Sequence, residues 1–306
     1  MDANTALPRC HLSVDVDPLR CYAEIHGLDP SLGGNAVYER AMLRFLDWLE
    51  RKRLKATFFV VTSDLDDPRF GVVNRGIVRE AVRLGHEIAS HTHSHPYHFD
   101  RLPAEEQEHE IARSVALIRE ATGVGPIGFR APGYNVRAEM VPMLARHGLR
   151  YDASILPSVP YWLLRAAMIG RIKLAGRKSG SQLGCFKNFA SGTRPRLMTH
   201  GGSVLREIPI SATPLGFPMV GTFLNLLGPE RLDSVLGFAA DCDPLHLEFH
   251  GVDLLELGHD GLPAELAVQR DLTIPLATKY AVLDRLADFV HGRFEIATLA
   301  EAARAR

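Results

Sequence analysis

The stretch HLSVDVD at residues 11–17 alternates polar and apolar side chains and ends in two aspartates. Strict alternation of this kind predicts a β-strand whose alternate side chains share one face. Asp15 and Asp17 would then lie on the same face, roughly 6.5–7 Å apart along the strand. Where this strand sits among the other elements therefore decides both the fold and the position of two carboxylates.

Strand-length apolar runs alternate with segments of helical periodicity along the rest of the chain. Tyr38, Met42, Phe45 and Leu49 recur at helical spacing after the first strand, and another helix follows Pro103. Repeated alternation of strands and helices predicts right-handed crossovers and a parallel sheet, closed as a barrel. We expect further strands at 56–61, 86–91, 127–133, 150–156, 203–211, 245–251 and 294–298, and further helices near 72–84, 135–148, 229–241 and 276–291.

The composition is that of an enzyme-sized soluble domain. The chain has 306 residues and a formal net charge of −1, which gives no reason to expect a nucleic-acid partner. The four cysteines are far apart, residues 1–4 carry no feature of a secretory signal, and no apolar run reaches the ~20 residues that span a bilayer. We therefore expect one domain over residues 1–306, reduced thiols and a cytoplasmic location.

One segment departs from this balance. Between residues 153 and 206 there is no Asp or Glu, and VPYWLLRAAMIGRIKLAGRK at residues 159–178 mixes aromatic, aliphatic and cationic side chains. We interpret residues 157–202 as an insertion in the domain. Its part at 160–180 would rest peripherally on an anionic membrane surface, or hold a phosphate. The alternative is a solvated helix that packs its apolar face on the domain, and the sequence leaves both open.

Polar side chains occur where several of the predicted strands end. In a parallel barrel the functional groups gather at the carboxyl ends of the strands, because all of these ends face one way. An aspartate after a single strand is usually a turn former, but several polar strand ends together indicate a site. The residues in question are Asp15, Asp17, His91, His95, Arg130, Asp152 and His250.

Three of these residues have the side chains of a metal site. His91 and His95 are four residues apart, which on a helical turn would place both imidazoles on one face. With Asp17 they would leave a coordination position open, as in catalytic rather than structural zinc sites. Cobalt, nickel or iron could fill the same ligands. His93 and His98 are interpreted as bystanders, since His93 would point elsewhere on such a turn and His98 lies beyond Pro96.

The remaining polar residues suit acid–base roles around such a metal. Asp15 would act as general base, and Arg130 would keep it ionised and oriented by a charge-assisted hydrogen bond. His250 would donate a proton to a departing amine, with a carboxylate such as Asp152 fixing its tautomer.

With these residues assembled, the sequence resembles the metal-dependent polysaccharide deacetylases, the carbohydrate esterase family 4 type. The spaced pair of aspartates is similar to the branch that contains lipid-linked amino-sugar deformylases. REIPIS at 206–211 and FEIATLAEA at 294–302 resemble later elements of the family. The motifs that carry the resemblance follow the family's order and are SVDVD (13–17), HTHSH (91–95), RAP (130–132), YDAS (151–154) and FHGVD (249–253).

The resemblance implies a distorted (β/α) barrel of about seven parallel strands and hydrolysis of an N-acyl group from an amino sugar. It implies a backbone N–H after the motif-three proline as donor to the oxyanion. In this chain that residue is Gly133, where the family usually has an aromatic residue, and Tyr134 follows it. For the other residues, the resemblance implies Asp15 as base, Asp17, His91 and His95 as ligands of zinc or another divalent metal, Arg130 as the partner of Asp15, and His250 as acid.

Three functions fit these observations. We favour hydrolysis of an acetyl or formyl group from an N-acylated amino sugar that is lipid-linked or membrane-associated, because the basic segment combines cations with apolar side chains. A second enzyme hypothesis keeps the metal but takes a small cyclic amide, as in allantoinase-like relatives. A third is a non-catalytic relative that binds glycan or lipid, which is disfavoured because every polar motif residue is present.

Overall fold

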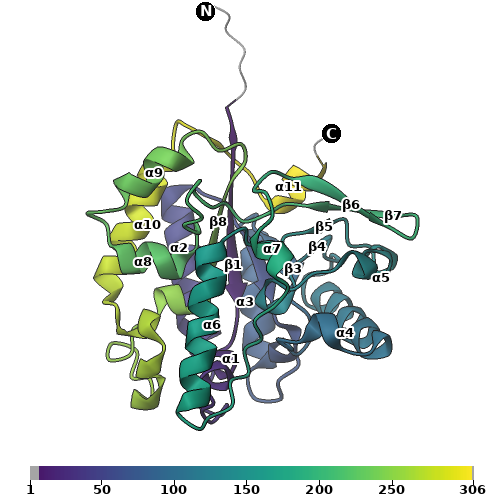
Figure 1. The fold of residues 1–306 in the computed structure, drawn as a ribbon, viewed down its shortest axis with the longest axis horizontal. Helices are drawn as coiled ribbons and strands as arrows, with labels where there is room; N and C mark the ends of the chain where they lie inside the picture. The colour runs from purple at the N-terminus through teal and green to yellow at the C-terminus, as the bar shows by residue number, and fades with distance from the viewer. Residues whose placement is uncertain (1–6, 305–306) are drawn as a thin grey trace, which may run out of the picture.

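The protein, seen in a computed structural model that describes residues 7–304, is built on one mainly parallel sheet with helices around it (Figure 1). Residues 1–4, on which the expected absence of a secretory signal rests, lie outside the described residues. The strands are β1 (Arg9–Val16), β2 (Thr57–Val60), β3 (Glu87–Ser90), β4 (Gly128–Phe129), β5 (Tyr151–Asp152), β6 (Arg196–His200), β7 (Ser203–Glu207), β8 (Leu245–His250) and β9 (Glu295–Ile296). The α-helices are α1 (Leu19–Ile25), α2 (Leu43–Lys52), α3 (Gly71–Arg83), α4 (Ala104–Thr122), α5 (Val141–Arg146), α6 (Val159–Leu174), α7 (Phe186–Phe189), α8 (Gly221–Leu227), α9 (Asp233–Ala239), α10 (Leu276–Val290) and α11 (Leu299–Arg304).

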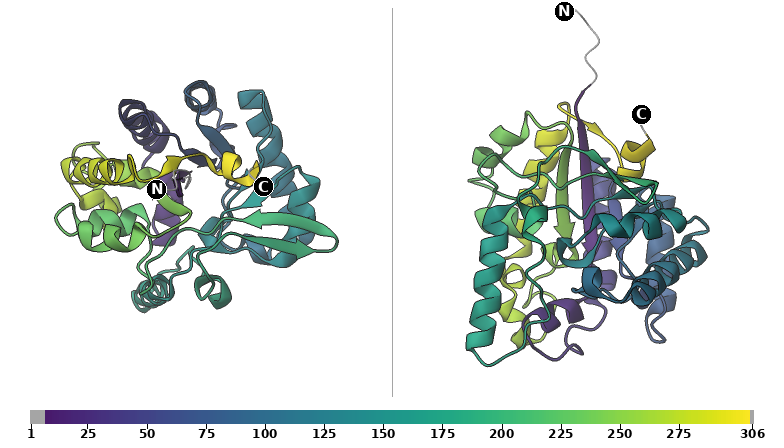
Figure 2. Two further views of the ribbon diagram at one scale, coloured as in Figure 1. Left: turned by 90° about the horizontal axis from the view of Figure 1, so that it is seen from above. Right: turned by 45° about the vertical axis from the view of Figure 1, so that its right-hand side comes forward.

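The strand order is β6-β7-β5-β4-β3-β2-β1-β8, with β9 paired to β1. All neighbours from β7 to β8 run parallel, and only β6 is antiparallel to its neighbour. This arrangement confirms the predicted α/β fold, and each predicted strand range overlaps an observed strand. Strand β6 was not predicted; it forms an exposed hairpin with β7 that projects from the ring of helices (Figure 2).

The expectation of a closed barrel is wrong. Within residues 7–304, β7 and β8 share no strand ladder, so the two ends of the sheet stay open. After β7 the chain continues as an irregular segment that contains Pro209, Pro214 and Pro218, and proline has no N–H to donate to a ladder. Single hydrogen bonds bridge the gap instead, such as Ser211 N to His246 O at 3.0 Å.

Strand β1 positions the polar residues, because it lies between β2 and β8 with its side chains almost fully buried. Asp15 is level with Phe59 on β2 and with His250 on β8. Ser13, two residues earlier, is level with Glu248. The parallel register therefore brings polar side chains of different strands together at the carboxyl ends.

Helix α6 forms where the sequence predicted the basic amphipathic segment. Ser158 caps it, since its Oγ accepts a hydrogen bond from Tyr161 N at 3.1 Å, and Pro160 occupies the first turn, where its missing N–H costs nothing. The helix stands beside the ends of β1 and β8 (Figure 1), and Arg165 is its only buried residue. No helix within residues 7–304 is long and apolar enough to cross a membrane. The boundaries of the insertion at 157–202 and the single domain stay predictions.

Close packing between β4 and β5 predicts the effect of a small substitution. An ideal Cβ at Gly128 would lie 2.1 Å from Cζ of Tyr151, a buried ring whose hydroxyl donates to Glu87. We expect Gly128→Ala to lower the free energy of unfolding by about 1–3 kcal/mol, as overpacking does, measured by urea denaturation.

The matched control is Gly76→Ala, because Gly76 lies inside α3 with open space around it. A helical Gly→Ala change there should raise the unfolding free energy by roughly 0.5–1 kcal/mol. Equal midpoints for Gly128→Ala and the unsubstituted protein would contradict the packing described.

Candidate metal centre and active site

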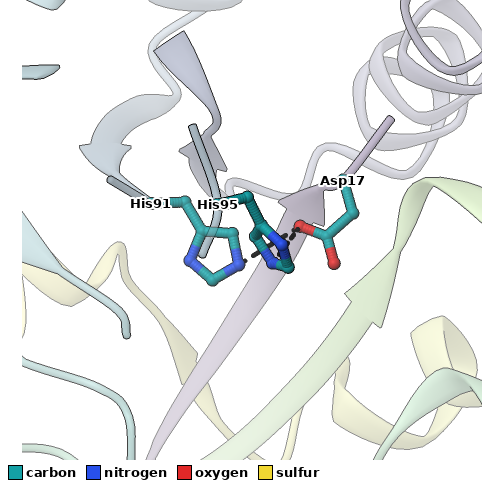
Figure 3. Close-up of side chains that lie close together, drawn as sticks. All are labelled: Asp17, His91 and His95. Carbon is teal, nitrogen blue, oxygen red and sulfur yellow. Dashed lines mark ion pairs between the residues drawn. The ribbon is translucent and has the colours of Figure 1, made fainter. Parts of the chain in front are cut away.

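Asp17, His91 and His95 meet at the carboxyl end of the sheet (Figure 3). Asp17 directly follows β1, and the two histidines follow β3. Oδ1 of Asp17 lies 3.2 Å from Nε2 of His91 and 3.4 Å from Nε2 of His95, and all three residues are buried. The predicted metal-ligand residues are therefore side by side, with their donor atoms converging on one point.

The loop that carries the histidines is not the helical turn that the sequence analysis assumed. Residues 91–98 are irregular, and both Thr92 and His95 have left-handed backbone angles, with φ of 65° and 64°. Thr92 Oγ1 accepts a hydrogen bond from His95 N at 3.1 Å, which closes the turn. The imidazole rings come to 4.9 Å between centroids because of this strained turn and not because of helical spacing.

The hydrogen bonds of the three side chains fit a bound cation. His91 Nδ1 lies 2.8 Å from Arg130 O, a carbonyl that can only accept, so in the neutral ring Nε2 presents a lone pair to Asp17. Oδ1 of Asp17 is buried and has no hydrogen-bond partner within the described residues. The Asp17 oxygen and this nitrogen lone pair are both electron-rich and would repel each other unless a positive charge lay between them. Two imidazoles and a carboxylate match the donor set of zinc.

Burial and charge set the protonation of this group. Burial lowers the pKa of His95 to about 4 despite the nearby Asp17 carboxylate, so its ring is neutral and able to act as a ligand. Burial alone would raise the pKa of Asp17, but His95 and His91 outweigh it and lower that pKa. The carboxylate is thus held in its ionised form.

His93 and His98 lie outside the convergence point, as predicted. His93 Nδ1 is 3.2 Å from Thr62 Oγ1, and the ring is half-buried. Glu110 on α4 accepts hydrogen bonds from the backbone N–H of His93 and Ser94, at 2.9 and 2.8 Å. This carboxylate, which the sequence analysis did not identify, fastens the histidine loop to α4.

Arg130 lies beside Asp15 as predicted, and both are buried. Its Nη1 donates to Oδ1 of Asp15 at 2.5 Å, and its Nε donates to Ala153 O at 2.8 Å. The guanidinium stacks over the Phe59 ring at 4.2 Å from the centroid. Oδ2, the other carboxylate oxygen of Asp15, lies 3.7 Å from Nε2 of His91, so Asp15 borders the candidate metal site.

His250 completes the group from β8. Its Nε2 lies 4.0 Å from Oδ2 of Asp15, and its backbone N–H donates to Asp253 at 2.8 Å. Burial alone would lower its pKa, but Glu248 and Asp15 raise it to about 9, so the ring carries a proton at neutral pH. Glu248 was missed by the sequence analysis. Its position two residues before His250 on a strand was the available signal, because such residues share a face.

Asp152 was predicted to fix the tautomer of His250, and this prediction is wrong. The carboxyl group of Asp152 accepts a hydrogen bond from Ser154 Oγ at 2.6 Å and lies level with Glu207 on β7. Burial and the neighbouring Asp152 carboxyl raise the pKa of Glu207 well above its usual range. Ser154 Oγ in turn accepts from Ala131 N at 2.7 Å. Asp152 thus supports the loop after β4 through Ser154. It is kept away from His250 because four strands lie between β5 and β8 in the sheet.

Gly133 and Tyr134 follow Pro132 in that loop, and both have φ of 64°. Tyr134 Oη donates to Oε2 of Glu248 at 3.1 Å, which ties the loop to β8. Both residues line a cavity of about 790 Å³ together with Asp15, Asp17, His91, His95 and His250. Residues of α6 and α8 and residues 267–271 also line this cavity.

Comparisons with known proteins agree with this fold. Residues 35–151 match the family model of polysaccharide deacetylases. Peptidoglycan deacetylase of Helicobacter pylori is 32% identical over 84 residues, which cover 27% of this chain and 28% of that protein. Chitin deacetylase 1 of Cryptococcus neoformans var. grubii is 32% identical over 105 residues, or 34% of this chain and 21% of that protein. The chain spans less than a third of either relative.

The fold is shared over a longer range. A solved structure from Mycobacterium smegmatis, described as a polysaccharide deacetylase, superposes with a TM-score of 0.60 at 16% identity. The alignment covers 99% of this chain and 91% of that one. At this level of identity the superposition establishes a common fold alone.

The convergence of three donors predicts where zinc binds. We expect Asp17→Ala and His91→Ala to weaken zinc binding by more than about 100-fold, since losing even a group that only orients a ligand costs roughly 10–100-fold. Zinc retained after dialysis, measured by plasma mass spectrometry, checks this.

The matched controls are His93→Ala and His98→Ala, from the same loop, which should keep stoichiometric zinc. Zinc retention by Asp17→Ala, or its loss from His93→Ala, would contradict the assigned ligands.

Proposed function

The chain carries a polysaccharide deacetylase domain, and from this premise we propose that it hydrolyses an N-acetyl or N-formyl group from an amino sugar. One observation carries the proposal. A buried carboxylate and two buried imidazoles converge beside a second carboxylate and the half-buried imidazole of His250, in a cavity at the carboxyl ends of a parallel sheet. This is where α/β barrels place catalytic groups.

The chemistry requires a divalent ion, and Asp17, His91 and His95 would hold it, zinc by the character of the donors and cobalt, nickel or iron as alternatives. Bound there, such an ion supplies a Lewis acid that polarises the amide carbonyl and lowers the pKa of a water molecule. Asp15 stands next to these ligands and takes the proton from the attacking water. Its ion pair with Arg130 fixes the orientation of the carboxylate.

Two groups on other strands serve the later part of the reaction. His250, protonated through its carboxylate neighbours, donates its proton to the departing amine of the sugar. The backbone N–H of Gly133, in the cavity wall, offers a hydrogen bond to the oxygen that becomes negative when the carbonyl is attacked.

We further propose that the sugar is attached to a lipid or lies at a membrane surface. The wall of the cavity also contains apolar side chains of α6 and α8, among them Met168, Ile172 and Phe223. On the outside of α6, Leu163 and Leu174 are 56% and 90% exposed. An apolar cavity wall would accept an aliphatic chain, and exposed leucines among cations favour an anionic membrane surface.

The role of Asp15 is tested by a nearly isosteric change. We expect Asp15→Asn to retain zinc and to lower kcat by about 100- to 10,000-fold, the usual contribution of a general base. The assay uses mass spectrometry to follow release of acetate or formate and appearance of the free amine on N-acyl amino sugars, with and without a lipid phosphate. Full activity of Asp15→Asn with normal zinc content would show that another group is the base.

Removal of the metal gives an independent test of the same proposal. We expect a chelator to abolish acyl release and stoichiometric zinc to restore it. Acyl release that persists in protein shown to be free of metal would contradict the proposed function.

The membrane proposal predicts binding to vesicles that contain phosphatidylglycerol. We expect the Leu163→Gln and Leu174→Gln double variant to bind them at least about 100-fold more weakly than the unsubstituted protein, since each buried leucine contributes roughly 1.5–3 kcal/mol and about 1.4 kcal/mol is a tenfold change in affinity. Val72→Gln on α3 is the control, because Val72 is 77% exposed and lies outside α6. Equal sedimentation of the double variant and the control would contradict the membrane contact.

A further inference from the structure

Arg165 on α6 is a buried cation in the wall of the active-site cavity. Its side chain donates from Nε to Ser181 Oγ at 3.0 Å and from Nη1 to Gly133 O at 2.9 Å. Both acceptors are neutral. Arg165 is 6% exposed, and the only other buried arginine in the described part of the chain is Arg130.

The two buried arginines differ in their partners. Arg130 pairs with the carboxylates of Asp15 and Glu248. For Arg165, no carboxylate of residues 7–304 lies within ion-pair distance. The surrounding sequence supplies none, because residues 153–206 contain no Asp or Glu. An unpaired buried charge costs several kcal/mol, so a guanidinium kept in this position indicates an anion that arrives from outside.

Gly133 makes the space for this guanidinium. An ideal Cβ at Gly133 would lie 2.7 Å from Nη2 of Arg165, so any side chain there would displace the guanidinium. The left-handed φ of Gly133 also favours glycine. The glycine at position 133, where the family that the sequence resembles usually has an aromatic residue, therefore leaves room for the Arg165 guanidinium. We refer to Gly133 and Arg165 together as one unit.

This unit adjoins the reacting groups. Arg165 and Gly133 line the same cavity as Asp17 and His250. Further cations line that cavity from the α6 side, Arg171 and Arg177, and both are exposed. A guanidinium offers parallel N–H groups that match two oxygens of a phosphate.

We propose that Arg165 binds a phosphate group of the substrate and thereby selects phosphorylated N-acyl amino sugars over neutral ones. The inference rests on the proposed function for the identity of the sugar, but the anion site follows from the charge and burial of Arg165. The phosphate is a monoester in a soluble sugar phosphate and a diester in a lipid-linked sugar, and Arg165 recognises the oxygens common to both.

Calorimetric binding tests the proposal without turnover, in zinc-loaded protein carrying Asp15→Asn. The probes are N-acetylglucosamine, its 1-phosphate and its farnesyl phosphodiester. We expect the 1-phosphate to bind roughly 10- to 100-fold more tightly than the neutral sugar, as hydrogen bonds to a charged group imply. Arg165→Gln should remove this preference. Lys173→Gln is the matched control, an exposed cation on the same helix outside the cavity wall, and should keep it.

The three probes separate the two sources of phosphate. Tighter binding of the diester than of the monoester indicates a lipid-linked sugar, and the reverse order indicates a soluble sugar phosphate. Either order supports the anion site if Arg165→Gln removes it. Equal binding of neutral and phosphorylated sugars, or a preference that persists in Arg165→Gln, overturns the proposal.

Thermal denaturation distinguishes this role from a structural one. If Arg165 only braced α6 against Gly133, its loss would lower Tm. We expect Arg165→Gln to unfold at or above the Tm of Lys173→Gln in the absence of anions, and phosphate to raise the Tm of Lys173→Gln more than that of Arg165→Gln. Arg165→Met, whose side chain has no charged or amide group, repeats the comparison if Arg165→Gln does not fold. Because binding is measured without catalysis, an inactive protein refutes the proposed function and leaves this result unaffected.

Discussion

Burial imposes one requirement on every ionisable group at the carboxyl end of this sheet, which is an opposite charge or a hydrogen-bond partner. Arg130 meets that requirement for several groups at once. Its guanidinium lies within ion-pair distance of both Asp15 and Glu248, and its backbone carbonyl oxygen fixes the ring of His91. Through this one residue β4 is linked to β1, β3 and β8. The positions of Asp15, the proposed base, and of His91, a proposed metal ligand, depend on that link.

Much of this arrangement follows from the sequence, because it depends on local periodicity and on the common direction of parallel strands. Alternation in residues 11–17 was enough to place Asp15 and Asp17 on one face, and strand order then brought His91, His95 and His250 to them. The strands themselves were predictable for the same reason. Strand β6 was not, since its exposed side chains show no buried face that a hydrophobic pattern could report.

The errors concern contacts that periodicity does not encode. The pairing of Asp152 with Glu207, and not with His250, depends on strand order in space. The approach of His95 to His91 depends on left-handed angles at Thr92 and His95, for which neither residue type is a signal. The barrel stays open at a segment that contains three prolines. The prolines are visible in the sequence, but their position in space between β7 and β8 is not.

The sequence left two structures open for the acid-free segment, and its helix α6 lines the cavity that holds the candidate metal ligands. The proposed reaction depends on these ligands holding a metal that keeps one coordination position open. X-ray absorption at the zinc edge of the zinc-loaded protein measures the coordination of the metal most directly. We expect two imidazole nitrogens at ~2.0–2.1 Å and oxygen ligands at ~2.0–2.2 Å from the zinc, with the oxygen ligands changed by added acetate. A sulfur-containing or four-nitrogen shell, or one indifferent to acetate, would contradict it.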